Sequence, residues 1–331
     1  MRFPPAGFIV VTLAFTALAP IARGDLVYAT SFSTGELIRY DLTDPVGSRT
    51  VLIPSGTMTR PSAAAIGPDG NLYIGVDGDG ASVAPSIERY DVAGGTLSSV
   101  HTFASFDVFP GSLVFDGDDL LVGRNPFFGN TGSILRLTNV TGGTVTVSER
   151  TTGGSLASSP GLAIAPDGRL YVADQTYDFL SGVASGSVKR FDAAGVFLGE
   201  VVADGAAGLA GPVGLAIRGT TLYTGSIMNG AVLRTDLASD ATTTFGTTGN
   251  PFEVGALALL SDGGLLAGSP SGFTGNIYRF AADGSLLSGF ASGLGQIGGL
   301  ATVAVPEPAM NPLAAGGMAA AAWLVRQSRR R

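Results

Sequence analysis

The chain has 331 residues, of which 45% are hydrophobic and 14% charged, with 50 Gly, 18 Pro, one His and no Cys. The lack of cysteine excludes thiol catalysis and thiolate metal sites. Six of the 19 basic residues lie in the two terminal segments, which leaves 13 basic against 26 acidic residues over 25–308. This net charge of −13 disfavours nucleic acids and anionic membranes as partners, and solubility outside the cell is enough to explain it.

Residues 1–24 are typical of a secretory signal peptide. Arg2 is the only early positive charge, residues 8–18 are apolar, and the stretch Ala22-Arg23-Gly24 has small residues where a signal peptidase acts. The sequence predicts cleavage before Asp25. An uncleaved anchor, or a chain start placed too early, remains the alternative.

A repeat fills the chain from 25 to 305. Each full unit has a small-apolar strand, a tight turn, a strand such as LYVAD, a loop, a strand such as SVKRFD and a fourth strand. The spacing of these units is roughly 40 to 50 residues, the length of a four-stranded propeller blade. The expected inner strands are 63–66, 113–115, 162–164, 215–217, 256–259 and 300–305.

The first and last units are incomplete in complementary ways. Residues 26–29, 36–40 and 50–53 supply three strands with no inner strand before them, and 300–305 is an inner strand with nothing after it. Joining them makes one blade, and closure of the ring removes exposed sheet edges. The sequence therefore predicts an all-β fold over 25–305, a six-bladed β-propeller with five whole blades and one closed by strands from both termini.

Two turn-containing segments, 67–77 (GPDGNLYIGVD) and 165–174 (APDGRLYVAD), together with the SVKRFD-like strands, resemble the six-bladed propellers of the NHL and gluconolactonase (senescence marker protein-like) type. That resemblance implies a possible divalent cation on the propeller axis, held by Glu, Asn and Asp where the inner strands begin. Of those positions here only Glu253 is a carboxylate, and Pro160 stands where the family has Asn. A hard cation prefers about six oxygen ligands, so we expect no cofactor, with an axial cation as the alternative.

Other catalytic signals are sparse. The lone His101 lies on or just after the last strand of its unit, where a surface or packed role is expected. The chain has no Gly-x-Ser-x-Gly elbow and no Walker-type loop. The stretches 77–80 (DGDG) and 116–119 (DGDD) lack the later ligands of a helix-loop-helix calcium site. They are interpreted as turns, with weak calcium binding as the alternative.

Long loops are expected on one face of the propeller, opposite the short Pro-Asp-Gly turns. They comprise 76–86, 123–132, 174–186, 268–275 and the links between blades. Aromatic and polar residues gather in them, as in a binding site on a rigid scaffold. The alternative is that the aromatic residues fold inward and hold the loops to the blades. The candidate binding residues are Asp107, Arg124, Phe127, Phe128, Asp174, Tyr177 and Glu253.

The C-terminal segment 306–331 has three parts in a fixed order. Pro306-Glu307-Pro308 is followed by a mostly apolar stretch over 313–325, and the chain closes with Arg326, Arg329, Arg330 and Arg331. This arrangement is similar to the PEP-CTERM sorting tail of Gram-negative bacteria. The resemblance implies export, transient retention in the inner membrane by a short transmembrane helix, and cleavage near Pro-Glu-Pro by an exosortase. Terminal arginines suit a segment that stops transfer, and an ordinary membrane anchor is the alternative.

These observations favour an exported propeller that is sorted to the cell surface or the extracellular matrix. The tail resemblance implies an association with exopolysaccharide and biofilm. We expect a non-catalytic binding or structural module, with a carbohydrate or a surface protein as partner, besides signal peptidase and exosortase during export. The alternative is an exported metal-dependent lactonase or lyase that uses Glu253, with Asp107 as a further candidate, on the axis. A redox propeller is a weaker option, because no cofactor-binding signature occurs.

Overall fold

The computed structural model describes residues 24–105, 108–125, 132–152, 155–178, 181–271, 275–287 and 289–305. The signal segment up to residue 23, the Pro306-Glu307-Pro308 motif, the expected transmembrane helix and the terminal arginines lie outside these residues. Asp107, Phe127 and Phe128 of the candidate binding face lie outside them as well. Within the described ranges, no helix has the length and apolar character needed to cross a membrane.

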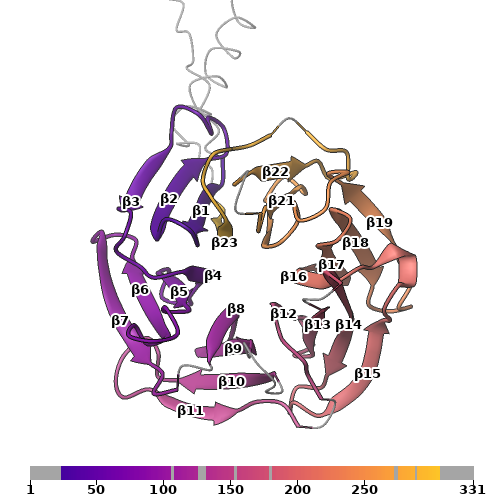
Figure 1. Cartoon of the computed structure of the whole chain (residues 1–331), viewed down its shortest axis with the longest axis horizontal. Coiled ribbons are helices and arrows are strands. Elements are labelled where there is room, and N and C mark those ends of the chain that lie inside the picture. The colour runs from indigo at the N-terminus through magenta and orange to yellow at the C-terminus, as the bar shows by residue number, and fades with distance from the viewer. Residues whose placement is uncertain are drawn as a thin grey trace, which may run out of the picture. The chain divides into compact units, whose positions relative to one another are not determined.

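Residues Gly24–Ala304 form one compact unit of six sheets arranged around a central axis (Figure 1). We number the blades in chain order from the first whole sheet. Blade 1 is β4 (Pro61–Ile66), β5 (Leu72–Val76), β6 (Ser86–Asp91) and β7 (Thr96–Thr102). Blade 2 is β8 (Phe109–Asp116), β9 (Asp119–Asn125), β10 (Ser133–Thr138) and β11 (Thr146–Glu149).

The later blades keep the same order. Blade 3 is β12 (Gly161–Ile164), β13 (Leu170–Asp178), β14 (Val183–Phe191) and β15 (Phe197–Val202), followed by the short 3₁₀-helix η1 (Ala206–Gly208). Blade 4 is β16 (Pro212–Arg218), β17 (Thr221–Ser226), β18 (Ala231–Asp236) and β19 (Thr242–Thr247). Blade 5 is β20 (Leu257–Leu259), β21 (Leu265–Gly268) and β22 (Ile277–Phe280).

Blade 6 joins the two ends of the propeller, as the sequence predicts. Its strand order is β23 (Ile297–Val303), β1 (Leu26–Ser31), β2 (Glu36–Asp41) and β3 (Thr50–Ile53). β23 lies beside β1 although the two strands come from opposite ends of the chain (Figure 1). The inner strands β4, β8, β12, β16, β20 and β23 contact one another in a closed ring.

The repeated motifs fold as local hydrogen bonding requires. In the Pro-Asp-Gly turns, Gly70 has φ 76° and Gly168 has φ 83°, a conformation in which a glycine avoids steric strain. The aspartate that ends the third strand then closes the next turn. Asp91 Oδ1, for example, accepts the backbone N–H groups of Ala93 and Gly94 at 3.0 and 2.9 Å. The same arrangement recurs at Asp192 and Asp236.

Hydrophobic cores lie between neighbouring blades. One cluster joins Leu121 and Ile134 of blade 2 to Leu170, Val172 and Phe191 of blade 3, and all five side chains are fully buried. Burial of one such side chain is worth about 1.5–3 kcal/mol. The apolar residues of the inner and second strands therefore hold each blade to the next.

The structure corrects two sequence-based boundaries. β13 does not end at residue 173, because it continues to Asp178 and pairs with β14 down to Asp178↔Val183, so 174–186 is largely a hairpin. Blade 5 is not a whole blade. In place of a fourth strand, the described residues after 284 contact β22 through two isolated bridges, Ile277↔Ala291 and Phe280↔Leu286, and through the Leu287 N–H, which donates to the Arg279 carbonyl at 2.8 Å.

Candidate functional site

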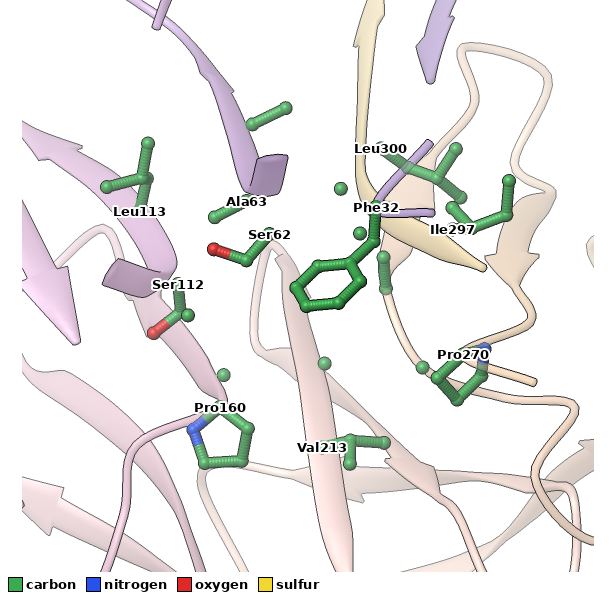
Figure 2. Close-up of a pocket in the computed structure, with 18 of the residues that line it drawn as sticks. Phe32, Ser62, Ala63, Ser112, Leu113, Pro160, Val213, Pro270, Ile297 and Leu300 are labelled. Carbon is green, nitrogen blue, oxygen red and sulfur yellow. The ribbon is translucent and has the colours of Figure 1, made fainter. Parts of the chain in front are cut away.

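A cavity of about 240 Å³ lies on the axis, at the face of the propeller that carries the loops between second and third strands. Figure 2 shows the hydroxyl groups of Ser62 and Ser112 on one side of it and Val213, Pro270 and Ile297 on the other. The ring of Phe32 projects between the two sides. We call this cavity the axial pocket.

The strand registers explain how six blades build the axial pocket. Each inner strand contributes a residue at the same register position, which pairs with the third residue of the second strand's buried run, as in Ala64↔Ile74 and Leu113↔Val122. Five of the six positions are leucines. We call them the leucine ring: Leu113, Leu162, Leu215, Leu257 and Leu300, with Ala64 in the sixth place.

Each inner strand carries a small residue one position closer to the loop face than its leucine-ring residue. These small residues let neighbouring inner strands approach closely, which keeps the pocket narrow. A Cβ on Gly214 would lie 2.3 Å from the Gly255 carbonyl oxygen of the next blade. The equivalent position in each of the other inner strands also holds a small residue, because neighbouring inner strands approach each other closely there. The six positions are Ala63, Ser112, Gly161, Gly214, Ala256 and Gly299.

The ends of the second strands form the rim. One side chain per blade lies three residues beyond the partner of the leucine-ring position, and these six differ in chemistry: Asp77, Asn125, Gln175, Ile227, Pro270 and Phe32. Four of them, Asp77, Asn125, Pro270 and Phe32, line the axial pocket. The rim is therefore polar at blades 1 and 2 and apolar at blades 5 and 6.

Asp77 carries the one carboxyl group among the described residues that line the axial pocket. Its Oδ1 accepts a hydrogen bond from Ser62 Oγ at 2.5 Å, and its backbone N–H donates to the Arg60 carbonyl at 3.0 Å. Burial raises the pKa of Asp77 to about 7, although the Ser62 hydrogen bond and the charge of Arg60 act in the opposite direction. The carboxyl group therefore titrates near neutral pH rather than in the acidic range.

The two amide side chains of the rim have structural partners. Asn125 Oδ1 accepts the Ser159 N–H at 2.6 Å, and Gln175 Nε2 donates to the Pro212 carbonyl at 3.2 Å. Each bond reaches a link that leads into the next blade. Asp77 differs, because among the described residues only Ser62 bonds to its carboxyl group.

The predicted binding residues do not all meet at the axial pocket. Glu253 is buried at 7% exposure, and its Oε2 accepts the Tyr278 hydroxyl at 2.9 Å. It does not line the axial pocket, whereas the lactonase alternative predicts that it lies on the axis. Asp174 is buried on β13, where Oδ2 pairs with Lys189 Nζ at 2.6 Å and Oδ1 accepts the Ala157 N–H at 2.7 Å. Its carboxylate therefore fastens the link between blades 2 and 3.

Two other predicted residues lie on the loop face. Arg124 is the last but one residue of β9 and is half-buried, with its backbone carbonyl accepting the Ser159 hydroxyl at 3.0 Å. Tyr177 lies on the extended β13–β14 hairpin and is 39% exposed. Of the predicted set, Tyr177 is thus the described side chain that is most open to solvent.

The weaker sequence signals have local explanations. Asp79 Oδ1 accepts three backbone N–H groups, those of Ala81, Ser82 and Val83, which fold the DGDG stretch into a tight turn. A hydrogen bond from the Ser82 hydroxyl, together with these backbone bonds, holds the pKa of Asp79 far below its usual range. His101 lies on β7 with its ring edge-on to Phe103 at 4.8 Å, and burial lowers its pKa.

The rim does not fit the divalent cation that the family resemblance implies. Within the described ranges, no three His, Cys, Asp or Glu side chains come together as a metal site. Asp77 would be the single carboxylate on the axis, and the leucine ring offers no oxygen ligand. We therefore derive no chemistry through a metal.

Sequence reasoning missed Asp77, Ser62 and Phe32 as site residues. A signal was present, because the second-strand stretches LYIGVD, LLVGRN, LYVADQ, LYTGSI and LLAGSP align by their leucines and end on the rim positions. Taken alone, the DGDG stretch that begins at Asp77 predicts a turn. Aligning the repeats with one another, rather than taking each alone, places it on the axis.

Comparison with known proteins supports the fold. No family model matches the chain, and no curated protein matches it. Among solved structures, the chain is similar to one in a crystal structure of a nidogen/laminin complex, with a TM-score of 0.66 and 14% identity. The match covers 86% of this chain and 100% of that chain. At this identity the likeness shows a shared β-propeller fold and no more.

Proposed function

We propose that this protein is an exported, non-catalytic binding module, which a C-terminal sorting tail delivers to the cell surface or the extracellular matrix. Its propeller presents the axial pocket and the surrounding loops to a carbohydrate or a surface protein there. The resemblance of the tail to PEP-CTERM segments supports a role associated with biofilm or exopolysaccharide.

The observation that carries this proposal is the chemistry of the axial pocket. A leucine ring, a wall of small residues and one carboxyl group suit the holding of a ligand. Among the described residues that line the pocket, no second Asp, Glu, His, Lys or Tyr stands beside Asp77 to pair with it as acid and base. A similar propeller in a structure of a protein–protein complex is consistent with a role in binding.

The position of the chain ends also supports the proposal. Leu26 of β1 pairs with Val303 of β23, whereas Ser31 at the other end of β1 pairs with Ile297, which lines the axial pocket. Both ends of the propeller thus lie a strand length from the pocket, about 20 Å for six residues. Leu26 and Val303 therefore leave the axial pocket and its loop face clear for a ligand.

Fractionation of bacteria that express Glu307→Ala tests the sorting part of the proposal. We expect this variant to stay in the inner membrane with its tail attached, whereas the wild-type protein is released and shortened. The measurement is the mass and the fraction of each protein on immunoblots. A Gln327→Ala variant in the same tail is the control, and unchanged processing of Glu307→Ala would contradict the proposal.

A second experiment tests binding. Labelled protein, purified after export, is added to cells that lack the gene, and we expect saturable retention at the surface. Tyr177→Asp, on the exposed hairpin of the loop face, should weaken retention, whereas Arg169→Ala, beside a Pro-Asp-Gly turn on the opposite face, should not. Retention that never saturates, or that neither variant changes, would contradict a specific binding role.

A further inference from the structure

The axial pocket joins one carboxyl group to an otherwise apolar lining. Asp77 stands at the rim of the pocket beside Ser62 of β4. The leucine-ring position of β4, Ala64, comes two residues after Ser62. Val213, Pro270, Ile297 and the ring of Phe32 complete the apolar side (Figure 2). A complementary ligand would therefore have one strongly polar group and a short apolar part beside it.

The partners that the Asp77 carboxyl group lacks indicate which polar group the ligand carries. Its Oδ1 accepts the Ser62 hydroxyl, and no other described side chain reaches its carboxyl group. The charge of Arg60 acts on Asp77 from nearby, but no Lys, Arg or His of the described ranges forms an ion pair with it, in contrast to Asp174, which pairs with Lys189. A half-buried carboxyl group without an ion-pair partner is costly, and an ammonium group supplies both a charge in direct contact and the hydrogen-bond donors that it needs.

We infer that the axial pocket binds a primary ammonium group attached to a short apolar chain, with Asp77 accepting the ammonium hydrogen bonds and the leucine ring contacting the chain. This inference rests on the proposed binding function and names the ligand class of that same site. The cavity, at about 240 Å³, is smaller than the ~300–1,000 Å³ of drug-sized sites. It suits a single residue-sized group.

Two sources share this chemistry, a free apolar amino acid and the N-terminal residue of a polypeptide. Arg60 bears on the choice, because it precedes β4 next to Asp77 and its side chain is exposed. Its φ of 60° lies in the left-handed region, an unusual backbone conformation for an arginine. A free amino acid would offer its carboxylate to this guanidinium group, whereas a polypeptide would not.

Calorimetric titration of the protein, purified after export, with leucine amide tests the inference. We expect binding at pH 8 that weakens at least tenfold in Asp77→Asn, because the amide cannot supply a negative charge. N-acetylleucine amide, which lacks the ammonium group, should not bind. Free leucine and the peptide Leu-Gly-Gly distinguish the two sources, since the tighter of the two identifies the natural class.

A second variant keeps the test independent of Asp77. Ala64→Leu completes the leucine ring with the residue that the five other strands already carry, and it should fill the space that the apolar chain needs. We expect it to lose leucine amide binding without a loss of thermal stability.

The inference is overturned if leucine amide does not bind, if Asp77→Asn binds it equally well, or if glucose binds instead. Glucose binding would assign the pocket to neutral polyols. Failure of all these ligands alongside intact surface retention would leave the proposed function standing. Loss of surface retention as well would contradict both.

Discussion

Asp77 shows how one residue takes its properties from its place in a repeat. Its equivalents in the blades that follow are Asn125 and Gln175, whose amide groups bond to the links of the next blade. A carboxyl group at this position has a different consequence, because burial acts against its charge. The same backbone position is therefore structural in two blades and titratable in a third.

This titration predicts a pH-dependent stability. The pKa of Asp77 is raised from 3.8 to about 7 in the folded protein, so between these values the folded state binds a proton that the unfolded state has lost. The stabilising contribution is complete below about pH 4 and disappears as the pH rises through 7. We expect the wild-type protein to lose up to about 1 kcal/mol per pH unit over this interval, relative to Asp77→Asn.

Thermal melts of the two proteins between pH 4 and pH 8 make the measurement. Subtracting one curve from the other removes the effect of His101, whose lowered pKa acts with the opposite sign in both proteins. A constant difference in melting temperature across this range would show that Asp77 is not buried as described.

The candidate site was harder to predict than the fold, and Asp174 shows why. The sequence predicts it in a loop after residue 173, whereas it lies within β13, and its partners, Lys189 and the Ala157 N–H, come from β14 and from the preceding link. Such tertiary pairing leaves no periodic signal. Asp77 also follows an apolar run of its second strand, but it accepts a hydrogen bond from Ser62 and forms no ion pair like that of Asp174 with Lys189. The two carboxyl groups thus differ in their tertiary partners and not in their sequence context.

At the scale of elements, turn chemistry and strand alternation were sufficient to predict most strands. The inner strands, the Pro-Asp-Gly turns and the third strands all occur where the repeat predicts them. The β13–β14 hairpin was not predicted, because Gln175, Thr176 and Tyr177 read as a polar loop. In the structure they pair with residues 184–186 without a third strand beside them.

Arginine contacts fasten the short turns of one blade to the next. Arg218, at the end of β16, donates from Nη2 to the carbonyls of Leu260 and Gly264 at 2.6 and 3.1 Å and from Nη1 to that of Gly263. These carbonyl groups belong to the turn between β20 and β21 of blade 5. A half-buried side chain thus closes the gap between two blades.

Removing this contact should destabilise the propeller. We expect Arg218→Ala to lower the free energy of unfolding by about 2–3 kcal/mol, since several charge-assisted hydrogen bonds are lost together. Arg234→Ala is the matched control, because that exposed side chain bonds to Thr243 of its own blade. Equal midpoints for both variants in urea denaturation would contradict the role assigned to Arg218.

At the scale of the whole molecule, stability depends on how the ring closes. Each blade packs on its two neighbours, so the cores are distributed around the axis. One of these cores joins Ile297 and Leu300 of β23 to Val27 and Ile38 of blade 6 and to Leu266 of blade 5. β23 also contacts β4 of blade 1, so the closing strand takes part in the contacts of blade 6 with both of its neighbours.

This arrangement predicts that β23 cannot be removed. A protein of residues 25–296 would leave β1 with an unpaired edge and would lose the hydrogen bond from the Gly299 N–H to Thr30 Oγ1 at 2.8 Å. We expect it to aggregate or to unfold without a cooperative transition, whereas 25–305 melts cooperatively. A cooperative melt of 25–296 at the same temperature would show that closure is dispensable.

Addition of the missing strand in trans separates closure from chain length. A peptide of residues 297–305 carries the whole of β23, and its backbone can pair with the exposed edge of β1 as an added strand. We expect this peptide to restore a cooperative melt to 25–296. The same peptide with Leu300 replaced by Asp is the control, because Leu300 is 5% exposed and a buried carboxylate there has no partner on β1, where it faces Ala29. Recovery with the control peptide would mean that backbone pairing alone closes the ring, whereas recovery with the natural peptide alone would show that closure also requires the apolar contacts around the axis.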